Sequence, residues 1–503
     1  MRRLLVISFM LLSIAAVDAQ DLSSRRMARQ SSVLRASEID GSVAAYLYGP
    51  WSSYTEAGVL LKGRDEKAPE YVQEGNGENL GIVDIRTLVR MDSLSAVRGS
   101  VRYSNGLRRN VCWNSSSDFR LLYPYVMADS IGGNLSREQY EFSGSYAARR
   151  GRWHYGLGAQ YRALHEYRQV DPRPRNIVSD LSASASAGYQ FGGSVLDLTV
   201  SYRKYVQSQN VDFFNERGAN TTEFHFTGLG SHFYRYMGSN SSLLQTRYEG
   251  EGVSMAASIF PVSVYGFRAR LAASSFNIAH CLTNQSDVPY TYLYTRTLFA
   301  SAGHIGHDGD LSYSIDLYGD LEDRRGTESV IDNGGGGYYA ELMHFKMYSA
   351  TSVEGGLRGA FELARPYGTW TVAPSACYDR FFSDYEYPYR KMMFSDFRTS
   401  IEAGFIKDWK SWIISGSVAG GCVKALSDEL EIPDDYTIPE IKDAYEALFA
   451  RHTSDLRSAG LRLYAEKMLS RRFSLGLDAS CKRLFLSGAG NSDYYELSIS
   501  VNF

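Results

Sequence analysis

The last nine residues of the chain, Tyr495-Glu496-Leu497-Ser498-Ile499-Ser500-Val501-Asn502-Phe503, alternate strictly between apolar and polar side chains. The apolar positions are Tyr495, Leu497, Ile499, Val501 and Phe503. A period of two predicts a β-strand with one apolar and one polar face, and this strand finishes on an aromatic residue. An ordinary edge strand of a soluble sandwich would show the same alternation.

The same alternation recurs upstream, for instance over residues 473–480 and 196–203. In a sandwich the apolar face would meet a second sheet, whereas in a membrane barrel it faces lipid. Candidate strands of about 9 to 14 residues, repeated along nearly the whole chain, match a barrel that crosses ~25 Å of hydrocarbon. We therefore expect an all-β, transmembrane antiparallel β-barrel over residues 54–503, with about 16 strands and 14 to 18 open.

The N-terminus has the pattern of a secretory signal peptide. Arg2 and Arg3 precede an apolar run from Leu4 to Val17, and Ala19 supplies a small residue for cleavage. We assign residues 1–19 to this peptide and residues 20–53 to a periplasmic or lumenal segment. Beyond residue 19 no run of about 18 apolar residues occurs, which excludes a helical membrane protein. Together with the terminal strand, whose aromatic end resembles the signal read by the barrel-assembly machinery, this predicts the outer membrane and contact with its lipid.

Composition excludes several classes of partner and site. The chain has 37 Tyr, 46 Gly and 12 Pro, a balance that favours strands and turns. Its net charge of −3 gives no general attraction to nucleic acid, so no nucleic-acid partner is expected. Five scattered cysteines without C-x-x-C spacing predict neither a disulfide framework nor a zinc site. No cofactor is expected.

Short and long connections alternate along the chain. Tight turns such as residues 149–152 and 192–193 contrast with long polar segments near 106–137, 208–240, 323–337 and 425–453. Barrels of the outer membrane place short turns at the periplasm and long loops outside. Tracing the strands from the two ends gives opposite directions for 351–364, so one strand is miscounted, and residues 54–62 and 378–390 are the doubtful pieces.

Two other features of these connections are interpreted in structural terms. Aromatic clusters, as at residues 123–125 and 385–389, suit the interfacial girdles of a barrel, and a platform for stacking carbohydrate is the functional alternative. Residues 437–452 have apolar positions at helical spacing, opened by Thr437 and Glu440 in capping-box spacing. They predict a short amphipathic helix on an external loop, which could cover the barrel mouth or meet a partner.

Catalytic, cofactor and metal sites are not predicted, because no nucleophile elbow, zinc-protease motif or phosphate-binding glycine loop occurs. His304, His307 and Asp308 have metal-like spacing but are expected to form an exposed polar turn. The alternation does predict charged side chains that line the lumen, where they could border a water-filled path or pair and seal it. They are Asp197, Arg203, Arg462, Glu466, Asp478, Lys482 and Glu496.

The run Glu223-Phe224-His225-Phe226-Thr227-Gly228-Leu229-Gly230, followed by Phe233-Tyr234-Arg235-Tyr236, resembles a segment of an uncharacterised family of outer-membrane barrels of Bacteroidota. The resemblance implies location and fold and carries over no site residues. It also implies, by analogy with some members, work beside a TonB-dependent uptake complex. From the residues themselves, the glycines indicate a tight bend or a close backbone approach.

Three functions remain open on the sequence. The first is a channel or an accessory of a transport or uptake system, which the polar lumen face and long loops favour. The second is a non-conducting surface or assembly protein that binds a partner through its loops. The third is an outer-membrane lipase or protease, for which the sequence offers no catalytic set.

Overall fold

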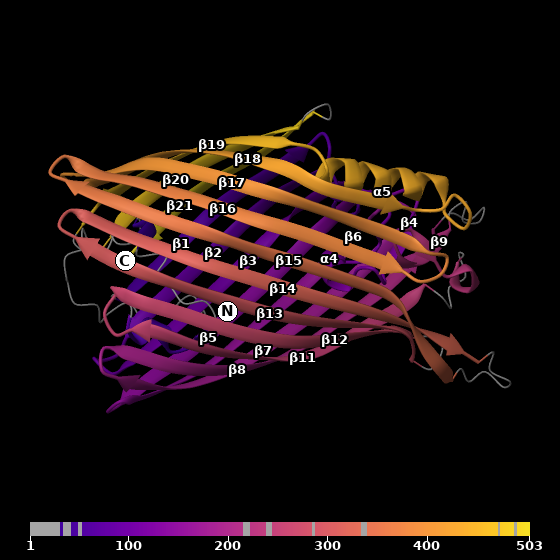
Figure 1. The fold of residues 1–503 in the computed structure, drawn as a ribbon, viewed down its shortest axis with the longest axis horizontal. Coiled ribbons are helices and arrows are strands. Elements are labelled where there is room, and N and C mark those ends of the chain that lie inside the picture. Colours follow the sequence, from indigo (N-terminus) through magenta and orange to yellow (C-terminus); the bar gives the residue numbers. More distant parts are fainter. Residues whose placement is uncertain are drawn as a thin grey trace, which may run out of the picture.

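The computed structural model describes residues 31–33, 42–48, 53–214, 222–237, 244–283, 287–332, 340–470, 473–486 and 490–503. The expected signal peptide, residues 1–19, lies outside these ranges, as does most of the segment 20–53. Within the described chain, eighteen antiparallel strands form one closed sheet (Figure 1). The fold class is therefore the expected one, an all-β closed barrel, but the number of strands is 18 rather than 16.

The strands of the barrel run up and down in chain order. They are β1 (Tyr54–Glu66), β2 (Gly77–Arg90), β3 (Ser95–Val111), β5 (Gly133–Arg150), β6 (Trp153–Tyr167), β7 (Arg173–Phe191), β8 (Ser194–Asp212), β11 (Gln245–Pro261), β12 (Gly266–Leu282), β13 (Val288–Asp308), β14 (Leu311–Ile331), β15 (Glu341–Arg365), β16 (Gly368–Tyr385), β17 (Arg390–Trp409), β18 (Trp412–Glu431), β19 (Leu456–Met468), β20 (Ser474–Leu486) and β21 (Gly490–Asn502).

The first and last strands close the ring. β1 pairs with β21 along its length, and the backbones of Thr55 and Phe503 exchange hydrogen bonds of 2.7 and 2.9 Å. The doubtful residues 54–62 are thus part of β1. The miscounted strand is β15, which the sequence pattern divides into two windows, 337–348 and 351–364. When the two windows are taken as one strand, tracing the strands from either terminus gives the same direction. Strand β15 then runs toward the end with the short turns.

The outer surface carries an apolar band. In β8, Leu196, Leu198 and Val200 are 43 to 55% exposed, whereas Asp197 and Thr199 between them are buried. Alternation of this kind along an antiparallel barrel presents apolar side chains to lipid and polar ones to the interior. The large exposed apolar side chains of the chain are therefore those of a membrane-facing wall, not of an unfinished soluble core.

The wall continues beyond this band at the end with the long loops. In β14, outward Leu317 and Leu321 are followed by outward Asp323 and Arg325, which form an ion pair of 3.0 Å. The strands are accordingly longer than predicted: β3 reaches Val111 and β14 reaches Ile331. A rim of polar-faced strand stands above the apolar band, so the long polar segments seen in the sequence are partly barrel wall.

Outside the barrel strands there are two α-helices in the described chain, α4 (Phe119–Leu122) and α5 (Pro439–His452), both at the end with the long loops (Figure 1). Helix α5 occupies the place where the sequence predicts one. Its expected capping box does not form: Ile438 is the N-cap, and the Thr437 hydroxyl donates to Pro433 O instead. No helix among the described residues is long and apolar enough to cross a membrane.

Candidate functional site

Two loops fold inward and fill the barrel at the long-loop end. The connection between β3 and β5 contains α4 and strand β4 (Met127–Asp129), and the connection between β8 and β11 contains β9 (Glu223–Gly228) and β10 (Ser231–His232). These short strands form a separate sheet in the order β10-β9-β4. We call residues 112–132 and 222–232 the plug. The expected bend in the second loop is the β9–β10 turn, where Leu229 has a φ of 46°.

One side of the plug is held by charged and polar groups of β6, β7 and β8. Asp118 accepts from Arg162 at 2.6 and 3.0 Å, and Asp129 forms an ion pair of 2.6 Å with Arg168. Ser115 O accepts from Asn176 Nδ2 on β7 at 2.9 Å and from Gln209 Nε2 on β8 at 3.0 Å. The barrel wall thus supplies donors for buried oxygens of the plug, which stabilises this loop inside the lumen.

The opposite wall holds the other side of the plug. Arg324 on β14 donates to the carbonyl oxygens of Arg120 and Tyr123 at 2.7 and 3.2 Å. Arg390 on β17 is fully buried and donates to Leu229 O at 3.0 Å. In the order of strands, β14 and β17 lie far from β6 to β8. The plug therefore bridges the barrel from one wall to the other.

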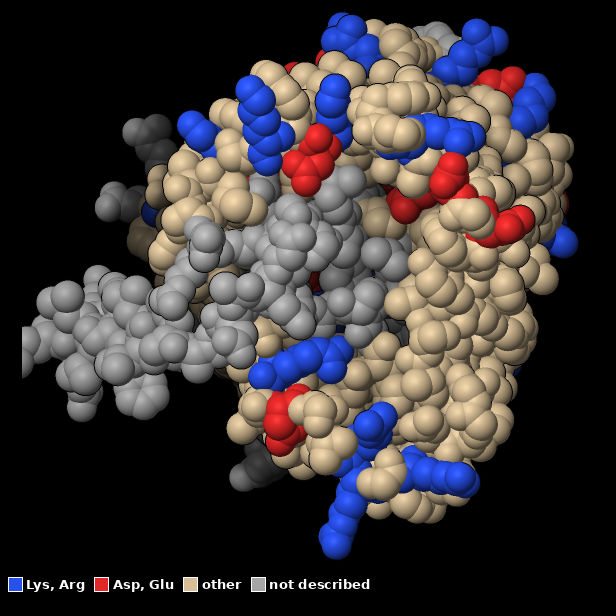
Figure 2. All heavy atoms as spheres, turned by 90° about the vertical axis from the view of Figure 1, so that its left-hand side faces the viewer, with Lys and Arg blue, Asp and Glu red and all other residues tan. Residues whose placement is uncertain are grey.

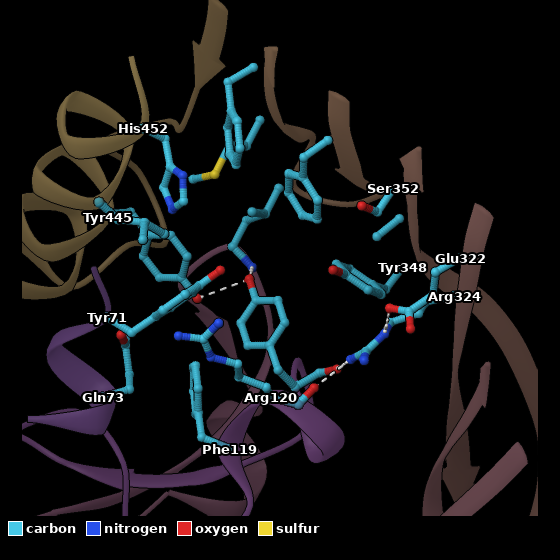
Figure 3. Close-up of a pocket in the computed structure, with 17 residues that line it drawn as sticks. Tyr71, Gln73, Phe119, Arg120, Glu322, Arg324, Tyr348, Ser352, Tyr445 and His452 are labelled. Carbon is cyan, nitrogen blue, oxygen red and sulfur yellow. Dashed lines mark hydrogen bonds and ion pairs between the residues drawn. The ribbon is translucent and has the colours of Figure 1, made fainter. Parts of the chain in front are cut away.

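Helix α5 covers part of this mouth and leaves a cavity of about 300 Å³ beneath it, the α5 cavity (Figure 3). Tyr445 of α5 is buried, and its hydroxyl donates to Tyr123 OH of the plug at 3.2 Å. The lining comes from the plug, from α5, from β14 to β17 and from the β1–β2 connection. It comprises Tyr71, Gln73, Phe119, Arg120, Tyr123, Leu229, Glu322, Arg324, Tyr348, Ala350, Ser352, Phe381, Met392, Phe394, Tyr445, Leu448 and His452.

Charged groups at the α5 cavity are paired among themselves. Arg120 Nη2 lies 2.8 Å from Glu74 Oε2 and 3.5 Å from Glu70 Oε2, and Arg324 Nε lies 2.7 Å from Glu322 Oε1. Burial lowers the pKa of His452 to about 4, so this side chain is neutral near pH 7. The cavity consequently offers no unbalanced positive charge among the described residues.

Two of the seven expected lumen residues lie on β8. Asp197 is buried and lies 2.7 Å from His154 Nε2, and Arg203 donates to Asp180 at 2.8 Å. Both share the face of β8 that carries Tyr205, whose hydroxyl donates to Asp118 of the plug at 3.0 Å. The pattern in the sequence thus assigns this pair to the same side as the plug.

The other five lie on β19, β20 and β21. Arg462 and Asp478 form an ion pair of 2.5 Å, Glu466 is buried, and Lys482 and Glu496 are exposed. The pairing register links this face, strand by strand, to the face of β17 that meets the plug. The side chains of Arg462 and Glu496 are 47 and 46% exposed, so no residue of the described ranges covers them inside the lumen.

A piece of the N-terminal segment lies inside the barrel at the short-turn end. Arg90 of β2 donates to Leu47 O and Tyr46 O at 3.1 and 3.0 Å, and Tyr48 OH lies 3.2 Å from His154 Nδ1 on β6. Residues 31–33 contact the opposite wall of the barrel, where Ser31 Oγ donates to Glu362 Oε2 on β15 at 2.7 Å. The two described pieces of this segment thus contact opposite sides of the lumen.

The rim at the short-turn end carries aromatic and basic side chains. Figure 2 looks onto this end and shows Lys and Arg side chains around its edge. Lys410 and Lys467 lie 5.5 and 5.3 Å from the rings of Trp409 and Trp412. Exposed Trp153 lies at the same end of the barrel. Trp beside Lys is typical of a membrane–water interface.

The aromatic clusters expected to form girdles have a different role. Tyr123, Tyr125, Tyr290 and Tyr385 are largely or fully buried at the plug, the last three 1 to 3% exposed. The plug backbone comes so close to them that a Cβ added at Gly228 would lie 3.0 Å from the Tyr385 ring. Tyr123 and Tyr125 belong to the plug itself, and Tyr290 and Tyr385 face it from the parts of β13 and β16 that extend above the apolar band. The girdle prediction was therefore wrong for these four rings, whereas Tyr387 and Tyr389 of the second cluster are exposed.

Sequence reasoning also missed the plug itself. Residues 112–129 have the pattern of a polar external loop, although Asn114-Ser115-Ser116-Ser117 between Trp113 and Phe119 is fully buried. A run of small polar residues flanked by aromatics is the available signal: it can lie close to polar walls while the rings pack. Nothing in its local pattern distinguishes the inside of a barrel from a solvated surface.

The described residues contain neither a candidate metal site nor a disulfide. No group of three or more His, Cys, Asp or Glu side chains there could hold a metal ion, and all five cysteines are free. His304, His307 and Asp308 belong to β13 rather than to a turn, and His307 Nδ1 lies 2.8 Å from Ser312 Oγ across the hairpin.

Solved structures similar to this chain are outer-membrane receptors. A mutant of the ferric enterobactin receptor PfeA from Pseudomonas aeruginosa is 9% identical, with 90% of this chain and 80% of that chain covered and a TM-score of 0.39. The alcaligin receptor FauA from Bordetella pertussis is 10% identical, with coverage of 90 and 76% and a TM-score of 0.37. The ferric-catecholate import receptor Fiu from E. coli is 8% identical, with coverage of 89 and 81% and a TM-score of 0.36.

No curated protein matches the chain. A family model does, over residues 43–503, which include every strand of the barrel, the plug and α5. The chain belongs to the Family of unknown function (DUF6850).

Proposed function

We propose that this chain is an outer-membrane β-barrel that takes part in solute transport, and that its plug closes the external mouth between transport events. The observation that carries the proposal is a lumen that the described residues leave open below a plug held by polar contacts. Arg462 and Glu496 are nearly half exposed inside the wall, whereas the mouth above is filled.

Barrel size supports a transport role. Barrels of about eight strands can be filled by their own side chains, whereas those of 16 or more enclose a channel or need a plug. With 18 strands, this chain encloses space that a purely structural barrel does not require. Gly, Ser and Ala recur on the inner face, as at Ser143, Gly158 and Ser184, and they leave that space free.

The proposed orientation of the barrel in the outer membrane is based on the differences between its two ends. The expected signal peptide, residues 1–19, directs export, and the Trp and Lys residues of the short-turn rim suit the periplasmic interface. The long-loop end with α5 then faces outward. The barrel-assembly machinery is the proposed reader of the terminal strand, and the N-terminal segment at the periplasmic opening is where a TonB-type uptake complex would reach the barrel.

Proteoliposome swelling tests the transport role. The variant replaces residues 114–130 by a short Gly-Ser linker, and folding is checked by heat-modifiable migration on gels. We expect small sugars to enter liposomes that carry the variant much faster than those that carry the native chain. Equal, background-level swelling of both proteins with folded barrels would rule out the proposed pathway.

A second candidate is a non-conducting surface or assembly protein that binds a partner through its loops. The exposed acidic residues of α5, Glu440 and Glu446, favour it, because they form a charged outer face above the plug. Deletion of residues 434–453 would then abolish partner capture by intact cells while swelling stays at background for both proteins.

A further inference from the structure

We infer that the α5 cavity is a binding site for an uncharged aromatic compound that carries one or two hydrogen-bonding substituents. This assignment does not depend on the proposed transport role, because it rests on the lining of the cavity alone.

Size and enclosure make the cavity a ligand site. Its volume of about 300 Å³ lies at the lower end of the range for small-molecule pockets, which run from roughly 300 to 1,000 Å³. Its walls come from five separate parts of the chain, with Tyr71 and Phe119 on one side and Tyr348 on the other (Figure 3). A closed packing of these parts would leave no such space, because protein interiors are packed to crystal-like density.

Aromatic rings dominate the lining. Phe394 stacks on His452 with ring centroids 4.4 Å apart and on Phe381 at 5.1 Å, while Tyr123 meets Tyr348 edge-on at 6.0 Å. A flat ring can enter such a set by offset or edge-to-face contact, which contributes beyond the burial of its area. This lining favours a planar, aromatic ligand.

Charge excludes ionic ligands. Arg120 is balanced by Glu74 and Glu70, and Arg324 is balanced by Glu322. A carboxylate ligand would have to displace these pairs, and an ammonium ligand would have to compete with Arg324 for Glu322, the carboxylate among the lining residues. Since burying an unpaired charge is costly, the ligand is neutral.

The lining also has uncharged polar side chains, those of Tyr71, Gln73, Tyr348 and Ser352, and one buried group without a partner among the described residues. His452 Nε2 is buried without a hydrogen bond in the described chain and lies 3.8 Å from the nearest Glu70 oxygen, too far for one. Tyr445 and Tyr123 already bond each other. A phenol or amide on an aromatic ring requires only one or two hydrogen-bond partners, while the flat ring itself packs against the aromatic side chains of the lining.

Calorimetric titration of the folded barrel in detergent tests this assignment with three soluble probes. They are 4-hydroxybenzamide, the charged analogue 4-hydroxybenzoate and methyl glucoside. We expect 4-hydroxybenzamide to bind with one site per chain and at least ten times more tightly than either other probe. Absence of 4-hydroxybenzamide binding, or tighter binding of the benzoate or the glucoside, would overturn the proposed ligand chemistry.

Two variants place the binding in this cavity. Ala350→Phe fills it from β15, and Leu448→Trp fills it from α5; each should weaken 4-hydroxybenzamide binding at least tenfold. Ala159→Phe adds the same ring to the exposed outer face of β6 and should leave binding unchanged. Protease resistance of the plug shows whether each variant keeps its fold. Unchanged binding in both folded filling variants would show that the probe binds elsewhere.

Discussion

Arg168 and Asp129 form an ion pair from which water is excluded: Nη2 lies 2.6 Å from Oδ2, and the side chains are 1 and 0% exposed. Arg168 follows β6, and Asp129 ends β4, so the pair ties the plug to the barrel wall. The same carboxylate accepts from the backbone of Ile131 and Gly132 at 3.0 and 2.7 Å. The Asp129 side chain thus stabilises the turn at residues 129–132 and also anchors this turn to the barrel wall.

Removing Asp129 should release the plug without unfolding the barrel. Asp129→Ala leaves a buried guanidinium without its partner, a change that typically costs about 3–5 kcal/mol. We expect residues 112–132 to become accessible to protease, while the barrel keeps its heat-modifiable migration. Limited proteolysis followed by mass spectrometry measures both.

The matched control is an exposed pair. Arg483 and Asp493 lie 2.6 Å apart at the long-loop end, but their side chains are 52 and 42% exposed. Because solvent screens such pairs, Asp493→Ala should leave the cleavage pattern of the plug unchanged. Equal resistance of the Asp129→Ala and native plugs would show that the buried pair does not hold this segment.

The plug should loosen as pH rises. Burial, and next the nearby Asp129 carboxylate, raise the pKa of Glu223 to about 8 from a usual value of 4.5. A raised pKa in the folded state means that the contribution to stability is full below about pH 4.5 and is lost as pH rises to about 8. Cleavage of the plug should therefore accelerate between about pH 5 and about pH 8.5.

Glu223→Gln isolates this carboxyl group, because the amide keeps its shape and does not titrate. The variant should have a flat cleavage profile across the same pH range, once corrected for the protease's own pH dependence on an unfolded substrate. A slope identical to that of the native chain would assign the effect to another group.

The N-terminal segment should depend on His154. Its imidazole lies 2.7 Å from Asp197 Oδ1 and 3.2 Å from Tyr48 OH. His154→Ala removes both contacts, and residues 42–48 should exchange backbone hydrogens faster, as measured by mass spectrometry. Exchange in β18, which makes no contact with His154, should be unchanged, and a uniform increase along both segments would indicate a damaged wall instead.

The terminal residue should matter for assembly more than for stability. Phe503 exchanges backbone hydrogen bonds with Thr55, and its ring lies 5.9 Å from that of Phe473. Phe503→Ala keeps the backbone pair, so refolding into detergent should match the native chain. Expression in cells should yield less folded barrel in the outer membrane, and equal yields would contradict a role as an assembly signal.

Much of the wall was predictable because period-two alternation is local. The terminal strand, β20 and the first half of β8 follow directly from it. The predicted number of about 16 strands was two below the 18 observed. The division of β15 is a separate error in the opposite direction: Tyr348 and Ala350 are buried, so the alternation expected of a lipid-facing strand breaks midway through β15. Strand β1 was doubtful for a different reason, since its pairing with β2 on one side and with β21 on the other identifies it as part of the wall.

The plug and the α5 cavity at the long-loop end of the barrel could not be predicted from local sequence patterns. Arg168 and Asp129 are 39 residues apart, and Arg390 meets Leu229 over 161 residues. Such contacts depend on closure of the ring, which no single stretch of sequence encodes. The helix at α5 was visible from its spacing, but the cavity beneath it is formed by side chains of five separate segments.

Single-channel recording in planar bilayers tests most directly whether the plug closes the lumen. The native chain should show little or no steady conductance. The folded variant in which a Gly-Ser linker replaces residues 114–130 should show stable open channels, and Asp129→Ala should show intermittent openings. Stable, large conductance of the native chain, or a silent deletion variant with a folded barrel, would contradict the account.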